Sequence, residues 1–127
     1  MKCNIILYVG DQERSTLFYK KLLAVEPILN VPGMTEFELS EQCVLGLMPE
    51  KGIKRLLGAT IPDPETTNGA SRAEIYFKVA DPEVFLKRAN EIGSKTLSPL
   101  SPRDWGDEAG YVMDPDGHVI AFARKLV

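Results

Sequence analysis

The feature that most constrains the fold is an internal repeat. The segment NIILYVGD at residues 4–11 recurs seventy residues later as EIYFKVAD at residues 74–81. Apolar and polar residues alternate in the second copy, which is typical of a strand with one buried and one polar face. Asp11 and Asp81 follow these strands as favoured helix N-caps, because a carboxylate can accept from the free backbone N–H groups of a first helical turn. Each copy therefore predicts a strand that leads into a helix.

Each predicted helix is followed by short apolar runs that predict further strands. They lie at residues 28–31, 36–39 and 43–48 in the first half, and at 95–97, 110–113 and 118–123 in the second. Pro82 suits the first position of the second helix, Gly93 suits its end, and DPDG at residues 114–117 favours a type I turn. Each half therefore reads β-α-β-β-β, and the predicted fold class is α+β with two βαβββ modules.

The two modules are predicted to share one domain over residues 1–127. The first covers about residues 1–48 and the second about residues 73–127, with a segment rich in glycine and proline at about 49–72 between them. A short helical turn is expected at residues 53–57. Connections of this length are usually lids, binding loops or linkers, and the sequence leaves open whether this one is a lid or a plain linker.

Composition narrows the classes of function. The net charge of −3 argues against nucleic-acid binding, which usually needs a basic face. No apolar run approaches the ~18 residues of a membrane span, and no signal peptide is recognisable, so a cytoplasmic protein is expected. Cys3 and Cys43 are then predicted to be buried thiols rather than a disulfide. With His118 as the only histidine, one chain cannot build a metal site from several imidazoles.

Several motifs together resemble a known superfamily. They are VGD at residues 9–11, STLFY at 15–19, WG at 105–106 and GYVMDPDG at 110–117. This combination resembles the vicinal oxygen chelate superfamily, which includes glyoxalase I, bleomycin-resistance proteins and extradiol dioxygenases. The resemblance implies that the modules form cupped mixed sheets around a cleft and that the chain forms a homodimer. Whether the modules pair within one chain or across the dimer is left open.

The resemblance also implies four positions for metal ligands, and the residues found there are poor donors. The positions correspond to Asn4, Gly46, Glu74 and Ala121. Metal-dependent members usually supply three or four histidines or carboxylates, whereas this set holds one carboxylate and one amide. No metal and no other cofactor is therefore expected.

Strand alternation places a mostly apolar and aromatic set of residues on the presumed cleft face, which suits a small-molecule site. This face is expected to have room for a ligand where Gly46, Ala121 and Ala123 occur. The residues predicted to bind a ligand are Asn4, Tyr8, Glu74, Tyr76 and Trp105.

Each of these residues also has a structural interpretation. Glu74 is the only candidate catalytic residue, but it could instead pair with Lys78 or Arg72. Trp105 could stack on a planar ligand or anchor its loop, and the two tyrosines could serve core or dimer packing.

Three further side chains are expected to take no part in binding. Arg103 and Asp104 are interpreted as surface charges, and His118 as solvated.

The function predicted from these observations is metal-independent binding of an apolar or aromatic small molecule. The alternative is a glyoxalase-like lyase or isomerase that uses Glu74 as general base, with Asn4 or Tyr76 steadying an oxyanion. A third possibility is a regulatory or interaction module.

Overall fold

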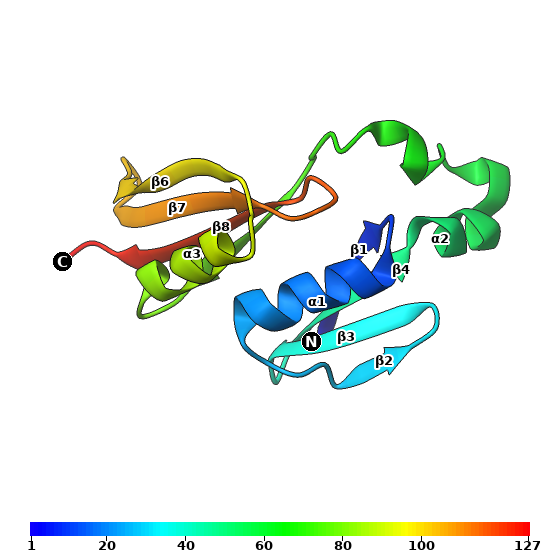
Figure 1. Cartoon of the computed structure of the whole chain (residues 1–127), viewed down its shortest axis with the longest axis horizontal. Coiled ribbons are helices and arrows are strands. Elements are labelled where there is room, and N and C mark those ends of the chain that lie inside the picture. The colour runs from blue at the N-terminus through cyan, green and yellow to red at the C-terminus, as the bar shows by residue number, and fades with distance from the viewer. The chain divides into compact units, whose positions relative to one another are not determined.

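The computed structural model describes all of residues 1–127 and divides into two compact units (Figure 1). One unit comprises residues 1–20 and 24–68, and the other residues 21–23 and 69–127. The first half contains β1 (Cys3–Val9), α1 (Gln12–Leu23), β2 (Leu29–Val31), β3 (Met34–Ser40), β4 (Cys43–Pro49), α2 (Glu50–Leu57), η1 (Gly58–Thr60) and η2 (Pro64–Thr67). The second half contains β5 (Glu74–Lys78), α3 (Pro82–Glu91), β6 (Thr96–Pro102), β7 (Asp107–Met113) and β8 (Val119–Lys125).

The two four-stranded sheets have the same topology. The strand order is β1-β4-β3-β2 in one sheet and β5-β8-β7-β6 in the other. In each sheet the first strand runs parallel to the last strand of its module, and the remaining neighbours are antiparallel. This confirms the predicted α+β fold of two βαβββ modules.

The starts of the two helices differ in how they are capped. Asp11 accepts a hydrogen bond from the backbone N–H of Arg14 at 3.0 Å, as predicted. The prediction that the Asp81 carboxylate also caps its helix is wrong, because that side chain makes no capping hydrogen bond. Its carboxylate instead lies 3.9 Å from the guanidinium of Arg124, and Pro82 begins the helix without needing a partner.

Each sheet buries one face against its helix. In the first sheet this face carries Phe37, Leu45 and Leu47, all fully buried, and the ring of Phe37 lies 6.5 Å from that of Tyr19 on α1. In the second sheet the ring of Phe122 lies 4.7 Å from that of Phe85 on α3. We call the opposite side of each sheet its helix-free face.

Gly110 allows α3 to approach the second sheet closely. A Cβ atom at this position would lie 2.5 Å from Leu86 Cδ1 and 3.2 Å from the backbone nitrogen of Leu100. The absence of a side chain at Gly110 therefore allows Leu86 of α3 to pack directly against the sheet.

The segment between the modules contains more helix than expected. The predicted turn at residues 53–57 is part of α2, which begins at Glu50 and buries Ile53. Lys54 Nζ donates to the carbonyl oxygens of Gly58 and Ile61 at 2.9 and 3.0 Å, which closes the chain around the end of this helix. The helices are all too short or too polar to cross a lipid bilayer.

The prediction of two buried thiols is wrong for Cys3. Cys3 is exposed and Cys43 is half-buried, and neither forms a disulfide. The reason is that β1 is an edge strand and Cys3 is its first residue, so no neighbouring strand covers its outer side.

Candidate functional site

The helix-free face of the second sheet carries three side chains linked by hydrogen bonds. The hydroxyl of Tyr76 on β5 donates to Asp107 Oδ2 on β7 at 2.8 Å, and Trp105 Nε1 donates to the Tyr76 oxygen at 3.0 Å. Asp107 is only 6% exposed, so its carboxylate needs such partners to offset lost hydration. The ammonium of Lys78, 3.8 Å from Asp107 Oδ2, adds a favourable charge. We call Tyr76, Trp105 and Asp107 the cluster.

Tyr76 is held in its neutral form by these surroundings. Burial raises the pKa of Tyr76 above its usual value, the hydrogen bond from Trp105 acts in the opposite direction, and the hydrogen bond and charge of Asp107 raise it further. The shift favours the protonated phenol, which is the form that donates to Asp107.

Arg103 fixes the turn that presents Trp105. Its guanidinium donates to the carbonyl oxygens of Ala109 and Pro99 and to the hydroxyl of Ser98, at 2.8–3.1 Å. The interpretation of Arg103 as a surface charge is therefore wrong, because its hydrogen bonds join β6 to β7 within the hairpin. Trp105 lies on this hairpin with 56% of its surface exposed.

Tyr111 extends the aromatic surface beside Tyr76. The two residues lie on either side of β8, where both pair with Ala121. The pKa of Tyr111 is raised by burial and by the charge of Glu74, and is lowered in part by Arg103, whose guanidinium lies 5.3 Å from the ring centre. Glu74 therefore acts electrostatically on this part of the sheet.

Small residues lie between the aromatic ones. Ala109, Ala121 and Ala123 are fully buried, so their positions on the helix-free face are covered by neighbouring atoms. At the equivalent place in the first sheet, a Cβ atom on Gly46 would lie 3.1 Å from Ile6 Cγ1 and 3.2 Å from Met34 Sδ. The expectation of room at Gly46, Ala121 and Ala123 is therefore wrong: Ile6 and Met34 occupy the space at Gly46, and neighbouring atoms cover the two alanines.

The predicted site residues are divided between the two units. Asn4 and Tyr8 lie on β1 in the first unit, where the Asn4 amide donates to Glu36 Oε2 at 3.2 Å. Glu74, Tyr76 and Trp105 lie in the second unit, and the structure brings Tyr76 and Trp105 into direct contact. Glu74 is exposed at the start of β5.

Asp107 was missed by sequence reasoning because β7 was expected to begin only at residue 110. Alternation extended back from Tyr111 through Ala109 would have placed Asp107 on the same face.

The positions that correspond to metal ligands do not fit a divalent ion. The register pairs Gly46 with Ile6 and Ala121 with Tyr76, which confirms that these are equivalent positions in the two repeats. Neither position has a donor side chain, and Asn4 uses its amide on Glu36. Glu74 alone offers an anionic oxygen, whereas divalent sites are built from several carboxylates, imidazoles or thiolates.

A second group of acidic residues has a structural role in the DPDG turn. Asp114 Oδ1 accepts from the backbone N–H groups of Asp116 and His118 at 2.8 and 2.9 Å, and Asp114 Oδ2 lies 2.7 Å from His118 Nδ1. The prediction of a solvated His118 is wrong, because its ring is half-buried and paired with a buried carboxylate. These contacts stabilise the turn before β8, which explains why the three side chains lie close together.

The first unit also contains an open groove of about 630 Å³ between α1 and the segment that leads into β2. Gln12 and Thr16 form part of its lining, and both contact the hydroxyl of the buried Thr35, at 3.0 and 2.8 Å. Leu17, also in the lining, is 51% exposed. The groove is on the helix side of the first sheet and contains none of the predicted site residues.

Comparisons with known proteins identify a family and a relative of this chain. A family model described as "Glyoxalase-like domain" matches residues 1–126. An uncharacterized protein of Mycobacterium bovis is 26% identical over 115 residues, which are 88% of this chain and 75% of that protein.

Solved structures share the fold. A glyoxalase-related enzyme from Fulvimarina pelagi has a TM-score of 0.83 at 22% identity, over 98% of this chain and 88% of that chain. A glyoxalase/bleomycin resistance protein/dioxygenase from Nocardioides has a TM-score of 0.79 at 19% identity, over 99% and 83%. At these identities the likeness concerns the fold and not the activity.

Proposed function

Since the chain belongs to the glyoxalase-like domain family, as its sequence motifs predicted, we propose that it is a metal-independent small-molecule-binding protein. Its ligand is an apolar or aromatic compound that contacts Trp105, Tyr76 and Glu74. The observation that carries this proposal is the hydrogen-bonded cluster, which holds an exposed tryptophan in a fixed orientation on a sheet face.

The cluster supports the proposal because it reduces the cost of binding. A free tryptophan side chain would lose conformational entropy when a ligand orders it. The Trp105 indole is already fixed by its hydrogen bond to Tyr76 and by the turn that Arg103 closes. A rigid and exposed aromatic ring of this kind can stack on a planar ligand with little further ordering.

The charges along β5 set the expected polarity of the ligand. Glu74 and Lys78 are both exposed, at opposite ends of the strand. Lys78 lies near the Asp107 carboxylate, whereas Glu74 lies on the Tyr111 side. A ligand with an aromatic body and a cationic group directed toward Glu74 would match this arrangement.

The donor set supports independence from metals. Of the two residues at the ligand positions in the second sheet, Glu74 is a carboxylate and Ala121 has no donor. The first sheet adds only the Asn4 amide, which is engaged by Glu36. Binding is therefore proposed to depend on stacking, hydrogen bonds and a single anionic charge.

Trp105 provides its own reporter for the test, because it is the only tryptophan. A panel of planar aromatic compounds, with and without a cationic group, would be titrated while indole fluorescence is followed. Binding should quench or shift the emission, and calorimetry should then show weaker binding to Trp105→Ala and Glu74→Gln.

Leu17→Ser, in the groove of the first unit, is the matched control and should bind as the parent does. Unchanged affinity in both site variants, with the fold retained, would refute the assignment. Weaker binding in the control alone would place the ligand in the groove.

A lyase or isomerase remains the alternative, and one observation favours it. The register places Glu74 and Tyr111 on the same face of the second sheet, on either side of β8, and a carboxylate and a phenol are groups that general acid–base catalysis uses. The test is turnover of dicarbonyl compounds or hydroxy-thioesters with a bell-shaped pH–rate profile that Glu74→Gln abolishes. Binding without turnover would support the proposal above instead.

A further inference from the structure

We propose that Cys3 and Cys43 form a reversible intramolecular disulfide between β1 and β4 when the protein meets a hydroperoxide. The inference is independent of the proposed function, because both cysteines lie in the first unit and outside the cluster. It rests on the register of one strand pair and on the exposure of one thiol.

The register places the two cysteines directly opposite each other. Strands β1 and β4 run parallel, and the pairing begins with Cys3 opposite Cys43. The backbone N–H of Cys3 donates to the carbonyl of Gln42 at 2.8 Å, which holds this end of the pair together. Neighbouring strands lie about 4.8 Å apart, and disulfides join Cα atoms about 4.4–6.8 Å apart, so the spacing suits a bridge.

The two side chains also emerge on the same face of the sheet. Opposite residues in a ladder share a face, and side chains alternate along each strand. Cys43 therefore lies on the face of Leu45 and Leu47, and Cys3 on the face of Val9.

The surroundings of the two cysteines allow an oxidant to reach a thiol and allow the strand ends to move slightly. Cys3 is exposed and Cys43 is half-buried, so an oxidant can reach Cys3 first. Both residues are the first of their strands. On the other side of Cys43 the β3–β4 register is irregular between Glu38 and Ser40, so the ladder is already relaxed there.

The chemistry balances with one hydroperoxide as oxidant. The Cys3 thiolate attacks the peroxide, an S–O bond forms, the O–O bond breaks, and hydroxide or alkoxide leaves and takes up a proton. The Cys43 thiolate then attacks the Cys3 sulfur, an S–S bond forms, the S–O bond breaks, and hydroxide leaves and takes up a proton to become water. Two thiols are oxidised and one peroxide bond is reduced, and a dithiol such as dithiothreitol reverses the result.

The test uses the full chain, reduced and then freed of reductant, with hydrogen peroxide as the probe. We expect both thiols to disappear together and the intact mass to fall by two hydrogen atoms. A digest without reductant should contain one linked pair of peptides that carries Cys3 and Cys43. The bridge should raise Tm by roughly 5–15 °C, because it closes a long loop in the unfolded chain. Dithiothreitol should restore the starting mass and Tm.

The single variants supply the control. Cys3→Ser and Cys43→Ser each keep one thiol, so neither can lose two hydrogens within the chain. Cys43→Ser should instead gain one oxygen at Cys3, which a sulfenic-acid trap such as dimedone captures. A disulfide between two chains in the parent, oxidation of each cysteine separately to sulfinic acid, or no reaction would each overturn the proposal.

Discussion

The hydroxyl of Tyr76 on β5 reaches over the intervening strand β8 and donates to the buried carboxylate of Asp107 on β7, at 2.8 Å. This bond connects two strands that are not neighbours in the sheet. It therefore links the internal stability of the second module to the surface on which Trp105 is presented.

Replacement of Tyr76 by phenylalanine tests this link. The variant keeps the ring but leaves Asp107 without its hydroxyl partner, with Lys78 as the remaining compensation. We expect the free energy of unfolding to fall by about 1–2 kcal/mol, as for other buried polar groups that lose a partner. Urea denaturation measures this quantity, and Tyr8→Phe on an exposed part of β1 is the matched control. Equal effects of the two substitutions would argue against the role of the Asp107 bond.

Alkaline pH should weaken the second module. The pKa values of Tyr76 and Tyr111 are raised above the usual 10.0, so the folded state favours the protonated phenols more than the unfolded state does. This contribution is fully present below pH 10 and is lost as pH rises through the folded-state pKa values. Tm measured across this range should fall, and it should fall less steeply in Tyr76→Phe. An unchanged slope in that variant would contradict the assignment to Tyr76.

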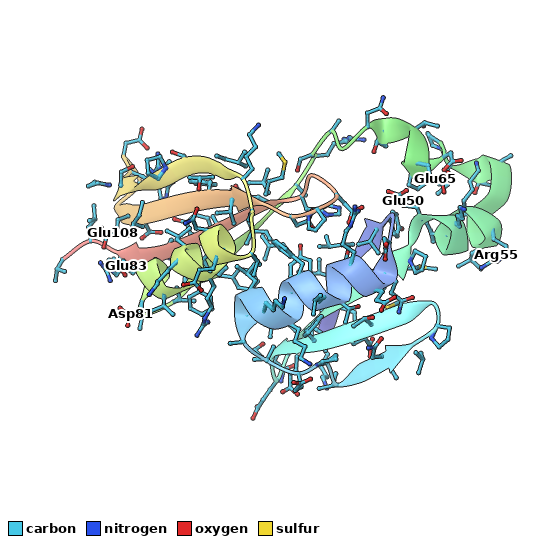
Figure 2. All side chains as sticks on the ribbon, viewed as in Figure 1. Glu50, Arg55, Glu65, Asp81, Glu83 and Glu108 are labelled. Atoms are coloured by element: carbon cyan, nitrogen blue, oxygen red, sulfur yellow. The ribbon has the colours of Figure 1, made fainter.

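Acid should weaken the attachment of α3 to the second sheet. Arg124 on β8 pairs with Glu108 and with Glu83 on α3, and Asp81 lies beside them at the same end of the unit (Figure 2). The pKa of Glu83 is lowered, first by a backbone hydrogen bond and then by Arg124. Its stabilising effect is therefore present above the unfolded pKa of 4.5 and is lost as pH falls through the folded value.

Arg124→Ala should accordingly lower Tm by about 3–5 °C near neutral pH and make Tm less sensitive to acid. Arg72→Ala removes an exposed arginine ahead of β5 and serves as the control. If both variants behave alike, the charges around Arg124 do not hold the helix.

A metal titration tests whether the residues at the four ligand positions can bind a divalent ion. Chelator-treated protein would be mixed with Mn²⁺, Fe²⁺, Ni²⁺ or Zn²⁺ and its Tm recorded, because a ligand that binds only the folded state raises stability. With only Glu74 as an anionic donor at the four positions, we expect no shift and no stoichiometric metal. A shift that Glu74→Gln removes would show that the chain completes a site that these positions do not predict.

Two glycines should tolerate a methyl group to different degrees. At Gly110 a Cβ atom would lie 2.5 Å from Leu86 and 3.2 Å from the backbone of β6, whereas at Gly46 its nearest neighbours are the side chains of Ile6 and Met34, at 3.1 and 3.2 Å. Gly110→Ala should therefore cost about 1–3 kcal/mol through overpacking, and Gly46→Ala less. Chemical denaturation of both variants gives the comparison, and a larger loss at Gly46 would contradict the packing described for α3.

The local elements could be predicted from sequence because their signals are local. The strand-to-helix repeat, the cap at Asp11 and the DPDG turn each depend on residues within a few positions of one another. The same reasoning failed at Asp81, whose carboxylate makes no capping bond and lies 3.9 Å from the guanidinium of Arg124 on β8.

The repeat, the alternation within strands and the poor donor set at the ligand positions were determined by the sequence alone, since each depends on residue type and spacing. Only the tertiary structure decided that Asp107 completes the cluster, that Arg103 closes the hairpin from within and that Cys3 faces Cys43. These three relationships depend on which strands become neighbours and in what register, and strand order is a property of the whole module. Their physical reason is the β-ladder: it brings Tyr76 to Asp107 and Cys3 to Cys43 from distant parts of the chain, and it pairs β6 with β7 so that Arg103 can bond to both.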